Sequence, residues 1–464
     1  MKQVPIFGMG YKAKSANVTA QTRVNMYLEI LPDKDKTQAV AYGTPGLTLL
    51  ADLGDTPFRC LQSLGNYVYG VHRGTFYQIT NAGVATSKGT LLTTTGRCGI
   101  DNNGSQIIVV DGTYGYTYTI ATDTFAQIAD ADFPGADTVT FNDGYFIVNE
   151  PDSGRFFLSA LYDGTSWDAL DFATAESNPD NLVSVVADHG ELILLGDIST
   201  EFWSNTGNVD FPYTRMSGAA VEWGLAARWS IAKFDNSLIW LAKNRMGKVQ
   251  VTRLAGYQPQ RVSTFDIENI INSYSSVSDA TGFSYLHNGH PFYQINFPTA
   301  GESWLYDGAS NVWSKMVSSG MTRHRAEIAT YFLNRTIVSD NSNGRLYNID
   351  GNEYTENGEE IVSEITTKHV AEGLERIFIH ALQVDIEPGV GLATGQGADP
   401  QIMLQVSRDG GHTWGAEMWR GMGKIGKYKT RALWTRLGMS RDFVFRFRIS
   451  DPVKRAILGA YISV

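Results

Sequence analysis

A repeated β pattern runs through the middle of this 464-residue chain and limits its fold more than any other feature. Each unit has an apolar residue, a polar turn of Asn, Asp or Gly, and then four or five strand-forming residues, as in "FNDGYFIVN" and "FDNSLIWLA". A second turn and strand follow each time, as in "GRFFLSAL" and "GRLYNIDG". The turns recur at intervals of 38, 40, 46, 46, 53 and 45 residues, at Asn66, Gly104, Gly144, Gly190, Asn236, Gly289 and Asn334.

A period of roughly 45 residues with about four short strands per unit is typical of β-propeller blades. One four-stranded blade cannot bury both of its faces, whereas radial stacking buries each face against the next blade. Asn-Gly and Asp-Gly turns supply the positive φ angles that two-residue hairpins need. We therefore predict an all-β fold with a β-propeller over residues 37–361, of seven blades, with six blades as the alternative.

The segments on either side of the repeat predict two further parts. Residues 1–36 have the pattern of an extended N-terminal arm with one strand, "RVNMYLEI", and a charged turn at 32–36. Such an arm has no core of its own, so we expect it to pack on something else, such as a neighbouring subunit. Longer alternating strands predict a C-terminal β-sandwich-like domain over residues 362–464. The one helix is expected at 265–275, where Ile residues recur with helical spacing.

Cysteine content and hydropathy exclude several classes of protein. Two cysteines, Cys60 and Cys98, are too few for a disulfide framework or a zinc site, and we expect two buried thiols. The N-terminus lacks the apolar run of a signal peptide. No window approaches the length of apolar sequence that a membrane-spanning helix needs. The expected product is made in a reducing cytoplasm and has no membrane-spanning segment.

Charge is distributed unevenly along the chain. The formal net charge is −10, yet residues 401–464 hold twelve Lys or Arg and only four Asp or Glu, which leaves an excess of 18 negative charges before them. Aromatic residues Tyr428 and Trp434 lie among the basic ones, and the predicted contact residues are Lys424, Lys427, Lys429, Arg431 and Arg436. These could contact DNA phosphates or an acidic protein neighbour. We favour the protein, because the rest of the chain is too acidic for a dedicated nucleic-acid binder.

The stretch "SRDGGHTWG" matches the Asp box, a hairpin motif repeated around the propeller of sialidases; its residues here are Ser407, Asp409, Gly411, Thr413 and Trp414. It lies between two strand-like runs, so we expect a hairpin tip. There Asp409 would accept backbone N–H bonds, Gly411 would supply an unusual φ, and Trp414 would pack back onto the hairpin. A sialidase would carry several copies on its blades and a triad of arginines. We therefore interpret the motif as a structural turn. The alternative is a propeller glycoside hydrolase or carbohydrate-binding protein, sialidase-like or a phage depolymerase.

No other motif requires catalysis. "GMGKIGK" at 421–427 has Gly-x-Gly-x-x-Gly spacing but lacks the strand–turn–helix unit that binds pyrophosphate, so we expect a basic loop. His287 and His290 in "HNGH" are expected to be surface histidines of a turn, since no third metal ligand is placed nearby. We predict no catalytic residue, no cofactor and no metal site, and a protein that is not an enzyme.

Several stretches, in order along the chain, resemble the packaged-DNA stabilisation proteins of short-tailed bacteriophages, which are also described as tail hub or nozzle proteins. The stretches are "RVNMYLE" at 23–29, "YGTPGL" at 42–47, "STEFW" at 199–203, "IENIINSYS" at 267–275, "SRDGGHTWG", "RALWTRLG" and "FRFRISDPV". The resemblance implies a structural protein of the virion tail, without enzymatic activity and built on a β-propeller.

The resemblance also implies partners. Proteins of this family assemble as a ring, typically a hexamer, beneath the portal and the head-tail adaptor protein. They extend the DNA channel, retain the packaged genome, take part in its ejection and carry the tail needle, fibre or tailspike proteins. Genomic double-stranded DNA would pass through the channel without sequence-specific contacts. If the wall of the channel is acidic, it would repel the DNA phosphates and let the duplex slide.

Overall fold

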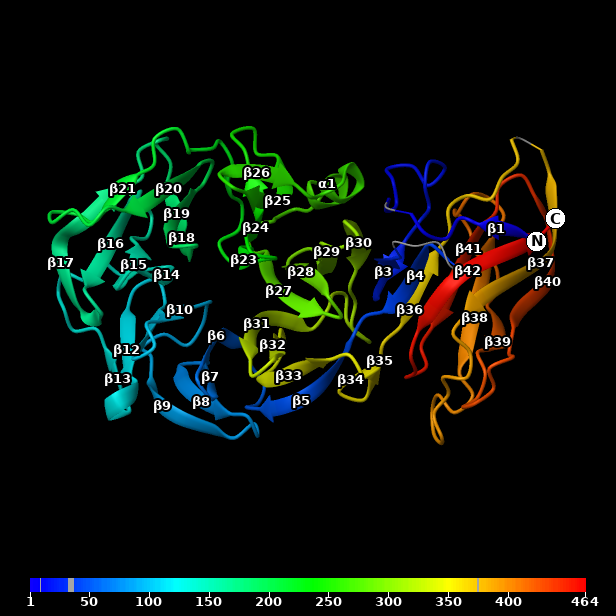
Figure 1. Cartoon of the computed structure of the whole chain (residues 1–464), viewed down its shortest axis with the longest axis horizontal. Coiled ribbons are helices and arrows are strands. Elements are labelled where there is room, and N and C mark those ends of the chain that lie inside the picture. The colour runs from blue at the N-terminus through cyan, green and yellow to red at the C-terminus, as the bar shows by residue number, and fades with distance from the viewer. Residues whose placement is uncertain (9, 32–36, 374) are drawn as a thin grey trace.

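The fold is given by a computed structural model that describes residues 1–8, 10–31, 37–373 and 375–464. The molecule is elongated, with a ring of sheets at one end and a second β domain at the other (Figure 1). The described chain holds one α-helix, α1 (Phe265–Ile271), and one 3-10 helix, η1 (Ile120–Thr122). Helix α1 begins where the predicted helix does and ends sooner. No helix among the described residues is long and apolar enough to cross a membrane.

The ring begins with four sheets, each of which is a four-stranded antiparallel meander in chain order. Their strands are β6 (Phe58–Leu64), β7 (Tyr67–His72), β8 (Thr75–Thr80) and β9 (Ala85–Thr90); β10 (Gly99–Asn102), β11 (Gln106–Val110), β12 (Gly115–Thr119) and β13 (Thr124–Gln127); β14 (Val139–Asn142), β15 (Tyr145–Asn149), β16 (Arg155–Ala160) and β17 (Asp163–Thr174); and β18 (Leu182–Asp188), β19 (Glu191–Gly196), β20 (Thr200–Asn205) and β21 (Tyr213–Arg215).

Three more sheets complete the ring, so the described chain forms seven blades, as the repeat predicted. In the fifth blade two short inner strands pair with the same neighbour, β24. The strands are β22 (Gly224–Leu225), β23 (Ala232–Lys233), β24 (Leu238–Lys243), β25 (Val249–Ala255) and β26 (Gln258–Arg261); β27 (Thr281–His287), β28 (His290–Phe297), β29 (Glu302–Asp307) and β30 (Val312–Lys315); and β31 (Ala326–Phe332), β32 (Arg335–Asp340) and β33 (Arg345–Asp350).

The seventh blade takes its outer strand from the other end of the propeller sequence. Strand β5 (Gly46–Asp52) pairs antiparallel with β33, with Leu47 opposite Ile349, and this pairing closes the ring (Figure 1). The short strand β34 (Thr355–Glu356) then pairs in parallel with β5 and antiparallel with β35 (Glu359–Glu360). Leu47 is only 2% exposed, so the closing strand also contributes to the core between the sixth and seventh blades.

Turn chemistry explains why the blades form where the repeat predicted. Between β27 and β28, Asn288 and Gly289 have φ angles of 49° and 81°, and Asp143 and Gly144 repeat the pattern between β14 and β15. Two consecutive residues with positive φ match the right-handed twist of a hairpin, and Asn, Asp and Gly tolerate them best. Trp313 is fully buried in the core that the fifth and sixth blades share.

The second domain is a β-sandwich built from both ends of the chain. One sheet has the order β3-β4-β42-β37-β40, with β1 pairing beside β42, and the other contains β2, β36, β41, β38 and β39. The strands are β1 (Lys2–Val4), β2 (Arg23–Val24), β3 (Met26–Ile30), β4 (Ala39–Gly43), β36 (Ser363–Thr366), β37 (Ile377–Ile386), β38 (Gln401–Ser407), β39 (Met418–Gly421), β40 (Ala432–Ser440), β41 (Val444–Ile449) and β42 (Ala456–Ser463).

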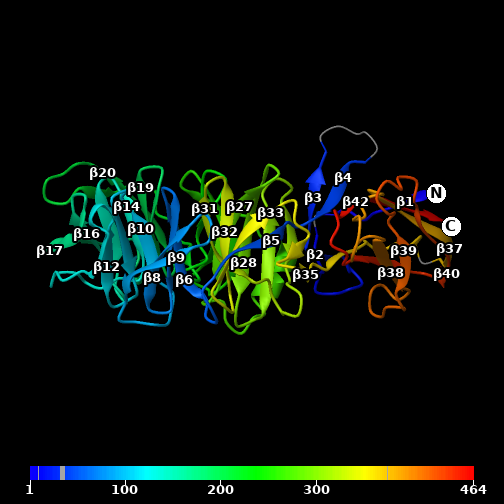
Figure 2. The ribbon, with the colours of Figure 1, turned by 90° about the horizontal axis from the view of Figure 1, so that it is seen from below.

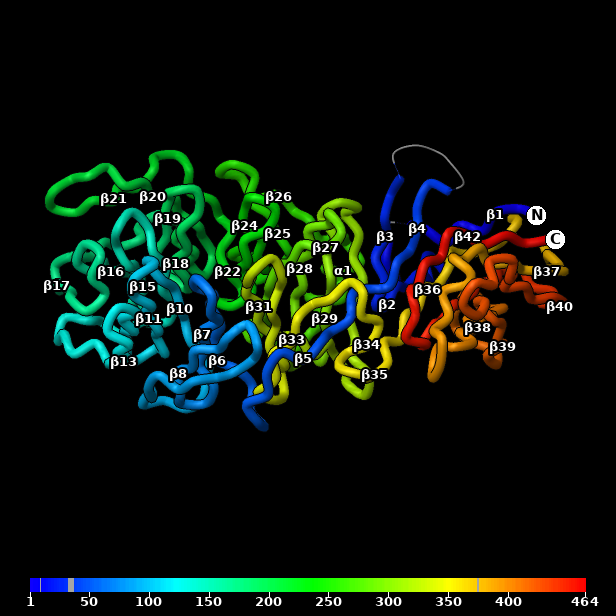
Figure 3. Tube along the Cα trace, turned by 60° about the horizontal axis from the view of Figure 1, so that its bottom comes forward, coloured from blue at the N-terminus to red at the C-terminus, as the bar shows by residue number. Residues whose placement is uncertain are grey.

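The structure differs from the expected extended arm over residues 1–36. Lys2 pairs with Ile462, and Val4, Met26 and Leu28 lie in the same apolar core as the C-terminal strands. The arm pattern was misleading because β1 pairs with residues more than 400 positions away and β2 pairs with β30 and β36, partners that no local periodicity reveals. The predicted charged turn at 32–36 lies outside the described residues. Both chain ends lie close together at the far side of the sandwich (Figure 3).

Candidate assembly surfaces

One continuous nine-stranded sheet joins the ring to the sandwich. Its order is β27-β28-β29-β30-β2-β36-β41-β38-β39, so the two-residue strand β2 links the sixth blade to the sandwich. Val24 pairs in parallel with Lys315 of the blade and antiparallel with Glu364 of β36. In the view from below, the two domains lie side by side along the long axis (Figure 2). Because backbone pairing crosses the boundary, the domains are held together more tightly than a free linker would hold them.

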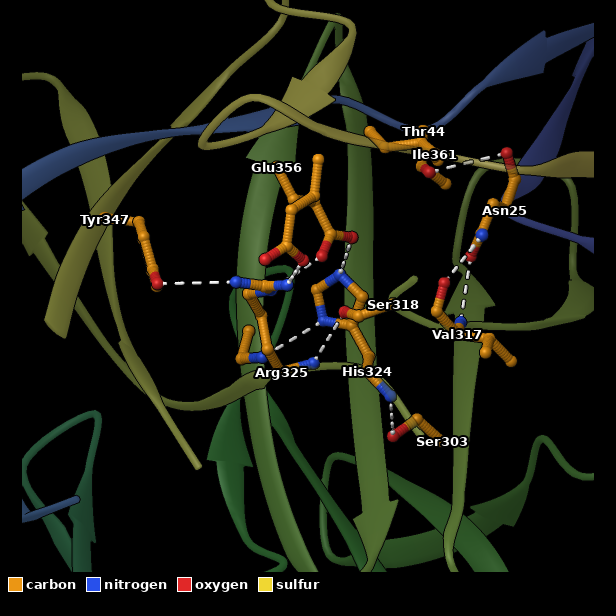
Figure 4. Close-up of polar contacts among 12 residues, drawn as sticks. Asn25, Thr44, Ser303, Val317, Ser318, His324, Arg325, Tyr347, Glu356 and Ile361 are labelled. Carbon is orange, nitrogen blue, oxygen red and sulfur yellow. Dashed lines mark hydrogen bonds and ion pairs between the residues drawn. The ribbon is translucent and has the colours of Figure 1, made fainter. Parts of the chain in front are cut away.

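Asn25 follows β2, and its side chain forms hydrogen bonds on both sides of the boundary between the sixth blade and the sandwich. Its backbone is left-handed, with a φ of 52°, a conformation that Asn adopts more readily than most residues. Its Nδ2 donates to the carbonyl oxygens of Val317 and Val362 at 2.8 and 2.9 Å, and its Oδ1 accepts from the N–H of Val317 at 2.9 Å (Figure 4). One buried amide thus satisfies backbone groups on both sides of the joint.

Two buried arginines reinforce the joint through carbonyl oxygens. Arg23 donates to the carbonyl oxygens of Gly8 and Gly10 in the N-terminal segment at 2.7 and 3.1 Å. Arg455 donates to those of Ile361 and Thr44 at 3.0 and 3.1 Å. Burial lowers the pKa of each guanidinium to about 10, so both stay charged at neutral pH. Charged donors make stronger hydrogen bonds than neutral ones. The two arginines together hold three chain segments, namely the N-terminal segment, the segment at Ile361 and the segment at Thr44.

A buried ion cluster holds the linker strand β34 against the seventh blade. Glu356, which is 2% exposed, accepts from Nε of Arg325 at 2.8 Å and lies 3.3 Å from Nε2 of His324 (Figure 4). Arg325 also reaches Glu359 and the hydroxyl of Tyr347. Burial raises the pKa of Glu356, but His324 and Arg325 outweigh it, so the pKa lies below its ordinary value. Strand β34 therefore stays bound to the seventh blade while the Glu356 carboxylate is charged.

The Asp-box residues form a compact turn between β38 and β39. Asp409 accepts from the Ser407 hydroxyl at 2.7 Å and from the Thr413 N–H at 2.9 Å, while the Ser407 oxygen accepts from the Gly411 N–H at 2.8 Å. Gly411 has a φ of 93°. Hydrogen bonds from Thr413 and Ser407 hold the pKa of Asp409 well below its usual range. The side-chain oxygens of Ser407, Asp409 and Thr413 thus all serve the turn itself.

The turn also contacts its surroundings. The Arg446 guanidinium, on the adjacent strand β41, lies 3.8 Å from the centre of the Trp414 ring, so Trp414 packs back over its own sheet. His412 Nε2 lies 2.9 Å from Asn17 Oδ1, which brings the loop before β2 against the turn. The Asp box therefore closes its own hairpin and also contacts the N-terminal segment.

The basic residues singled out from the sequence lie on the sandwich, in the loop after β39 and on the edge strand β40. Lys424, Lys427, Lys429, Arg431 and Arg436 are all exposed. Lys424 has a weak contact with Asp399 at 3.6 Å. With the described residues, the other four form no ion pair. Ile425 and Tyr428, 64% and 73% exposed, lie within the same loop. We call residues 424–436 the basic segment.

One residue assigned to this surface from the sequence belongs elsewhere. Trp434 is 1% exposed, packs in the sandwich core and donates from Nε1 to the carbonyl oxygen of Met418 at 2.9 Å. Alternation along β40 places it inward while its neighbours point outward. The exposed aromatic residues of this edge are instead Tyr428 and Trp419.

A second surface, missed by sequence reasoning, lies on the propeller. The hairpins that join the first to the second strand of each blade, and those that join the third to the fourth strand in the first six blades, emerge on one face of the ring. That hairpin face carries nine of the large exposed apolar side chains of the described chain, namely Tyr67, Val84, Leu161, Tyr162, Val209, Tyr257, Leu286, Tyr331 and Leu333. The opposite face carries Leu92, Met246 and Phe265. A depression of about 830 Å³ on the hairpin face is lined by Tyr331 and Leu286, among others.

One of the two histidines of "HNGH" differs from the expected surface residue of a turn. His290 is 7% exposed, and its Nδ1 lies 3.0 Å from Asp307. This contact to Asp307 raises the pKa of His290. Among the described residues, no group of three or more His, Cys, Asp or Glu is placed to hold a metal ion. Cys60 and Cys98 are both free and buried, as predicted.

Comparison with known proteins finds two family models that match the chain in sequence order. The model described as the β-propeller of bacteriophage P22 Gp10 matches residues 2–354, and the one described as its β-sandwich matches residues 363–464. The tail hub protein gp10 of Salmonella phage P22 is 23% identical over 493 residues, an alignment that covers 100% of this chain and 99% of that protein.

Solved structures resemble the propeller weakly. The WD40 domain of Neurospora crassa Pan2 is 8% identical with a TM-score of 0.44, and the match covers 66% of this chain and 96% of that one. The N-terminal domain of Nup159 is 8% identical with a TM-score of 0.41, covering 71% and 99%.

Proposed function

This chain belongs to the family of the bacteriophage P22 Gp10 protein, and we propose that it serves as the hub, or nozzle, of a short phage tail. In that role it is a structural component of the virion tail. It extends the DNA channel below the portal and adaptor, retains the packaged genome and takes part in its ejection. The observation that carries the proposal is the match of both family domains, in order, together with the full-length alignment to a tail hub protein.

The joint between the two domains suits a protein that must resist mechanical force. A nozzle must keep its shape against the pressure of packed DNA, and here a shared sheet, a buried amide and two buried arginines cross the boundary between ring and sandwich. Each of these contacts would have to break before the domains could turn against one another. We therefore propose that each subunit works as a single stiff body.

We propose that copies of the chain assemble as a ring, a hexamer as in the resembling family. The exposed hairpin face and the basic segment are the two surfaces offered to other proteins. The basic segment suits an acidic neighbour, because complementary charge guides encounter and fixes register. We assign that neighbour to the head-tail adaptor, and the hairpin face to the tail needle, fibre or tailspike proteins. Genomic DNA would pass the ring without specific contacts.

We propose a structural rather than a catalytic role for the Asp box. Its carboxylate and both hydroxyls are engaged within the turn, and the motif lies on the sandwich instead of on the blades. A glycosidase needs a pair of carboxyl groups that face a sugar across a cleft. The single Asp-box turn therefore supports the tail role over the carbohydrate-cleaving alternative.

The proposal is tested by a phage that lacks this gene product. We expect filled heads that lose DNA and carry no tail, and we expect purified wild-type chain to restore the tail in vitro, visible by electron microscopy as a six-fold ring below the adaptor. Complete, infectious particles formed without the chain would refute the tail role. Restored tails with another symmetry would leave the tail role standing and refute only the hexamer.

A further inference from the structure

The two cysteines of the chain come from neighbouring blades and meet in one apolar core. Cys60 lies on β6 of the first blade, and Cys98 comes directly before β10 of the second blade. Both are buried in the cluster that these two blades share, with exposed fractions of 3% and 2%. The sequence contains no other cysteine, so a disulfide within one chain can only join these two.

The backbone brings the two residues within reach of a disulfide. The N–H of Cys98 donates to the carbonyl oxygen of Arg59, the residue before Cys60, at 3.1 Å. Standard backbone dimensions then keep the Cα atoms of Cys60 and Cys98 within about 7 Å of each other. A disulfide spans Cα atoms that are roughly 4.4–6.8 Å apart. The Cys98 thiol also donates a hydrogen bond to the sulfur of Cys60, so the two side chains point toward each other.

The surroundings of the pair favour a thiolate at Cys60. Burial raises the pKa of Cys60, but hydrogen bonds from the Cys98 thiol and the Val71 N–H, together with the charge of Arg97, outweigh burial and lower it. The hydrogen bond to Cys60 and burial both raise the pKa of Cys98, which therefore keeps its proton. Because the thiolate is the nucleophile in cysteine chemistry, Cys60 is the attacking group.

We propose that Cys60 and Cys98 form a disulfide when the folded chain meets hydrogen peroxide, and that this bond ties the first blade to the second. The Cys60 sulfur attacks one peroxide oxygen, the O–O bond breaks, and a sulfenic acid forms as water leaves. The Cys98 sulfur then attacks the sulfenic sulfur, the S–O bond breaks, and the thiol proton leaves with the hydroxide as a second water. The two thiols lose two electrons in total, and one peroxide is reduced to two waters. Both residues line a cavity of about 220 Å³ on the axis of the ring, which has room for so small an oxidant.

The disulfide would enclose one whole blade in a covalent loop, because the four strands β6 to β9 all lie between residues 58 and 90. Such a loop restricts the unfolded chain and so stabilises the folded ring. A phage tail leaves the reducing cytoplasm when the host lyses, so the bond would form after release. This timing rests on the proposed tail role, whereas formation of the disulfide does not.

The first experiment treats the purified full-length chain with hydrogen peroxide and then alkylates it in denaturant. We expect no alkylated cysteine, and mass spectrometry should find the peptides of Cys60 and Cys98 linked, with the loss of two hydrogen atoms. The midpoint of thermal unfolding should rise by roughly 3–6 °C and return to its starting value after reduction. Two alkylated thiols after this treatment, or sulfinic acid without a linked peptide, would overturn the proposal.

Two variants test which thiol attacks. Cys98→Ser keeps a hydrogen-bond donor beside Cys60 but cannot close the bond, so peroxide should leave a sulfenic acid on Cys60 that dimedone traps. Cys60→Ser is the matched control and should give little dimedone adduct, because Cys98 keeps its proton. Neither midpoint should rise with peroxide. Equal adducts in the two variants would overturn the assignment of Cys60 as the attacking thiol. The wild-type measurement needs no variant, so the proposal stays testable if either variant fails to fold.

A third measurement tests the timing. Infected cells quenched with N-ethylmaleimide before lysis should yield chain with both thiols alkylated, whereas purified particles should yield the linked peptide. Free thiols in purified particles, with a purified chain that oxidises, would overturn formation after release while the disulfide itself stands. Absence of the chain from purified particles would instead refute the tail role.

Discussion

Nη2 of Arg23 donates a hydrogen bond to the carbonyl oxygen of Trp313 at 3.0 Å, although 290 residues separate the two in the chain. Arg23 belongs to the N-terminal segment of the sandwich, and Trp313 lies on β30 of the sixth blade. The bond therefore crosses the boundary between the domains, and it is fully buried on both sides. A joint built from such buried contacts resists bending.

We expect Asn25→Ala to lower the free energy of unfolding by about 2–4 kcal/mol, because it removes three buried hydrogen bonds and leaves Ala in a left-handed conformation. Calorimetry should then show the ring and the sandwich melting separately. Asn25→Gly is the control, since Gly adopts the same φ without strain and loses only the hydrogen bonds. If Asn25→Ala unfolds at the wild-type midpoint in one transition, this amide does not hold the joint.

Closure of the ring by β5 predicts opposite outcomes for two leucines of one strand. Leu47 is 2% exposed and packs in the core between the sixth and seventh blades, whereas Leu49 is 45% exposed. Leu47→Ala should cost about 3 kcal/mol through lost burial and a cavity. Leu49→Ala should change stability by no more than about 0.5 kcal/mol. Urea unfolding followed by tryptophan fluorescence measures both. Equal effects in the two variants would contradict the pairing of β5 in the seventh blade.

The Asp box should contribute to stability and not to any reaction. Asp409→Ala removes the acceptor of the Ser407 and Thr413 bonds and should cost on the order of 1 kcal/mol. Thr413→Val removes only one of these bonds and should cost less. Both variants should assemble into particles. A wild-type activity on oligosaccharides that Asp409→Ala abolishes, with folding unchanged, would show that the turn has a chemical role.

The buried ion cluster should make stability depend on acid pH. The folded pKa of Glu356 is lower than its unfolded value, so its contribution is fully present above the ordinary Glu pKa and is lost as pH falls through the folded value. Glu356→Gln at pH 7 should cost about 3 kcal/mol, since it leaves Arg325 and His324 with one partner fewer. The difference in the free energy of unfolding between wild type and the Glu356→Gln variant, measured by urea unfolding, should become smaller from pH 7 to pH 3.5. A constant gap over that range would mean that Glu356 is not charged in the folded protein.

The basic segment should matter for assembly and not for folding. A chain in which Lys424, Lys427 and Lys429 are changed to Glu should melt like wild type, because all three side chains are exposed. It should fail to add to particles that have only portal and adaptor, and their DNA should leak. The same three residues changed to Arg keep the charge and should restore addition, more weakly at high salt. Normal assembly of the Glu variant with slow DNA ejection would place the lysines at the DNA channel instead of the adaptor.

The blades could be predicted because their signals are local. Asn288 and Gly289, or Asp143 and Gly144, set a hairpin with two adjacent residues, and the recurrence of such pairs gave the number of blades. The Asp-box turn was predictable for the same reason, since Ser407, Asp409 and Thr413 bond only to one another and to nearby backbone. Its contact with Asn17 was not, because 395 residues lie between His412 and Asn17.

What could not be predicted depends on distant pairing. Strand β5 completes a blade whose other strands begin at residue 326, and β1 pairs with β42 at the opposite end of the chain. Trp434 appeared to belong to a basic surface because sequence proximity does not tell which side of an edge strand faces the core.

The pairing of β1 and β4 with β42 has a consequence for how the protein is made. Strand β42, residues 456–463, lies inside its sheet between β4 and β37, so the sandwich cannot be completed until those residues have left the ribosome. The propeller, whose strands lie between residues 46 and 350, can form during synthesis. A chain broken off early would therefore carry a finished ring but no finished sandwich, and it would lack the surface on which the basic segment sits. Translation to the last strand would thus decide which copies can join a particle.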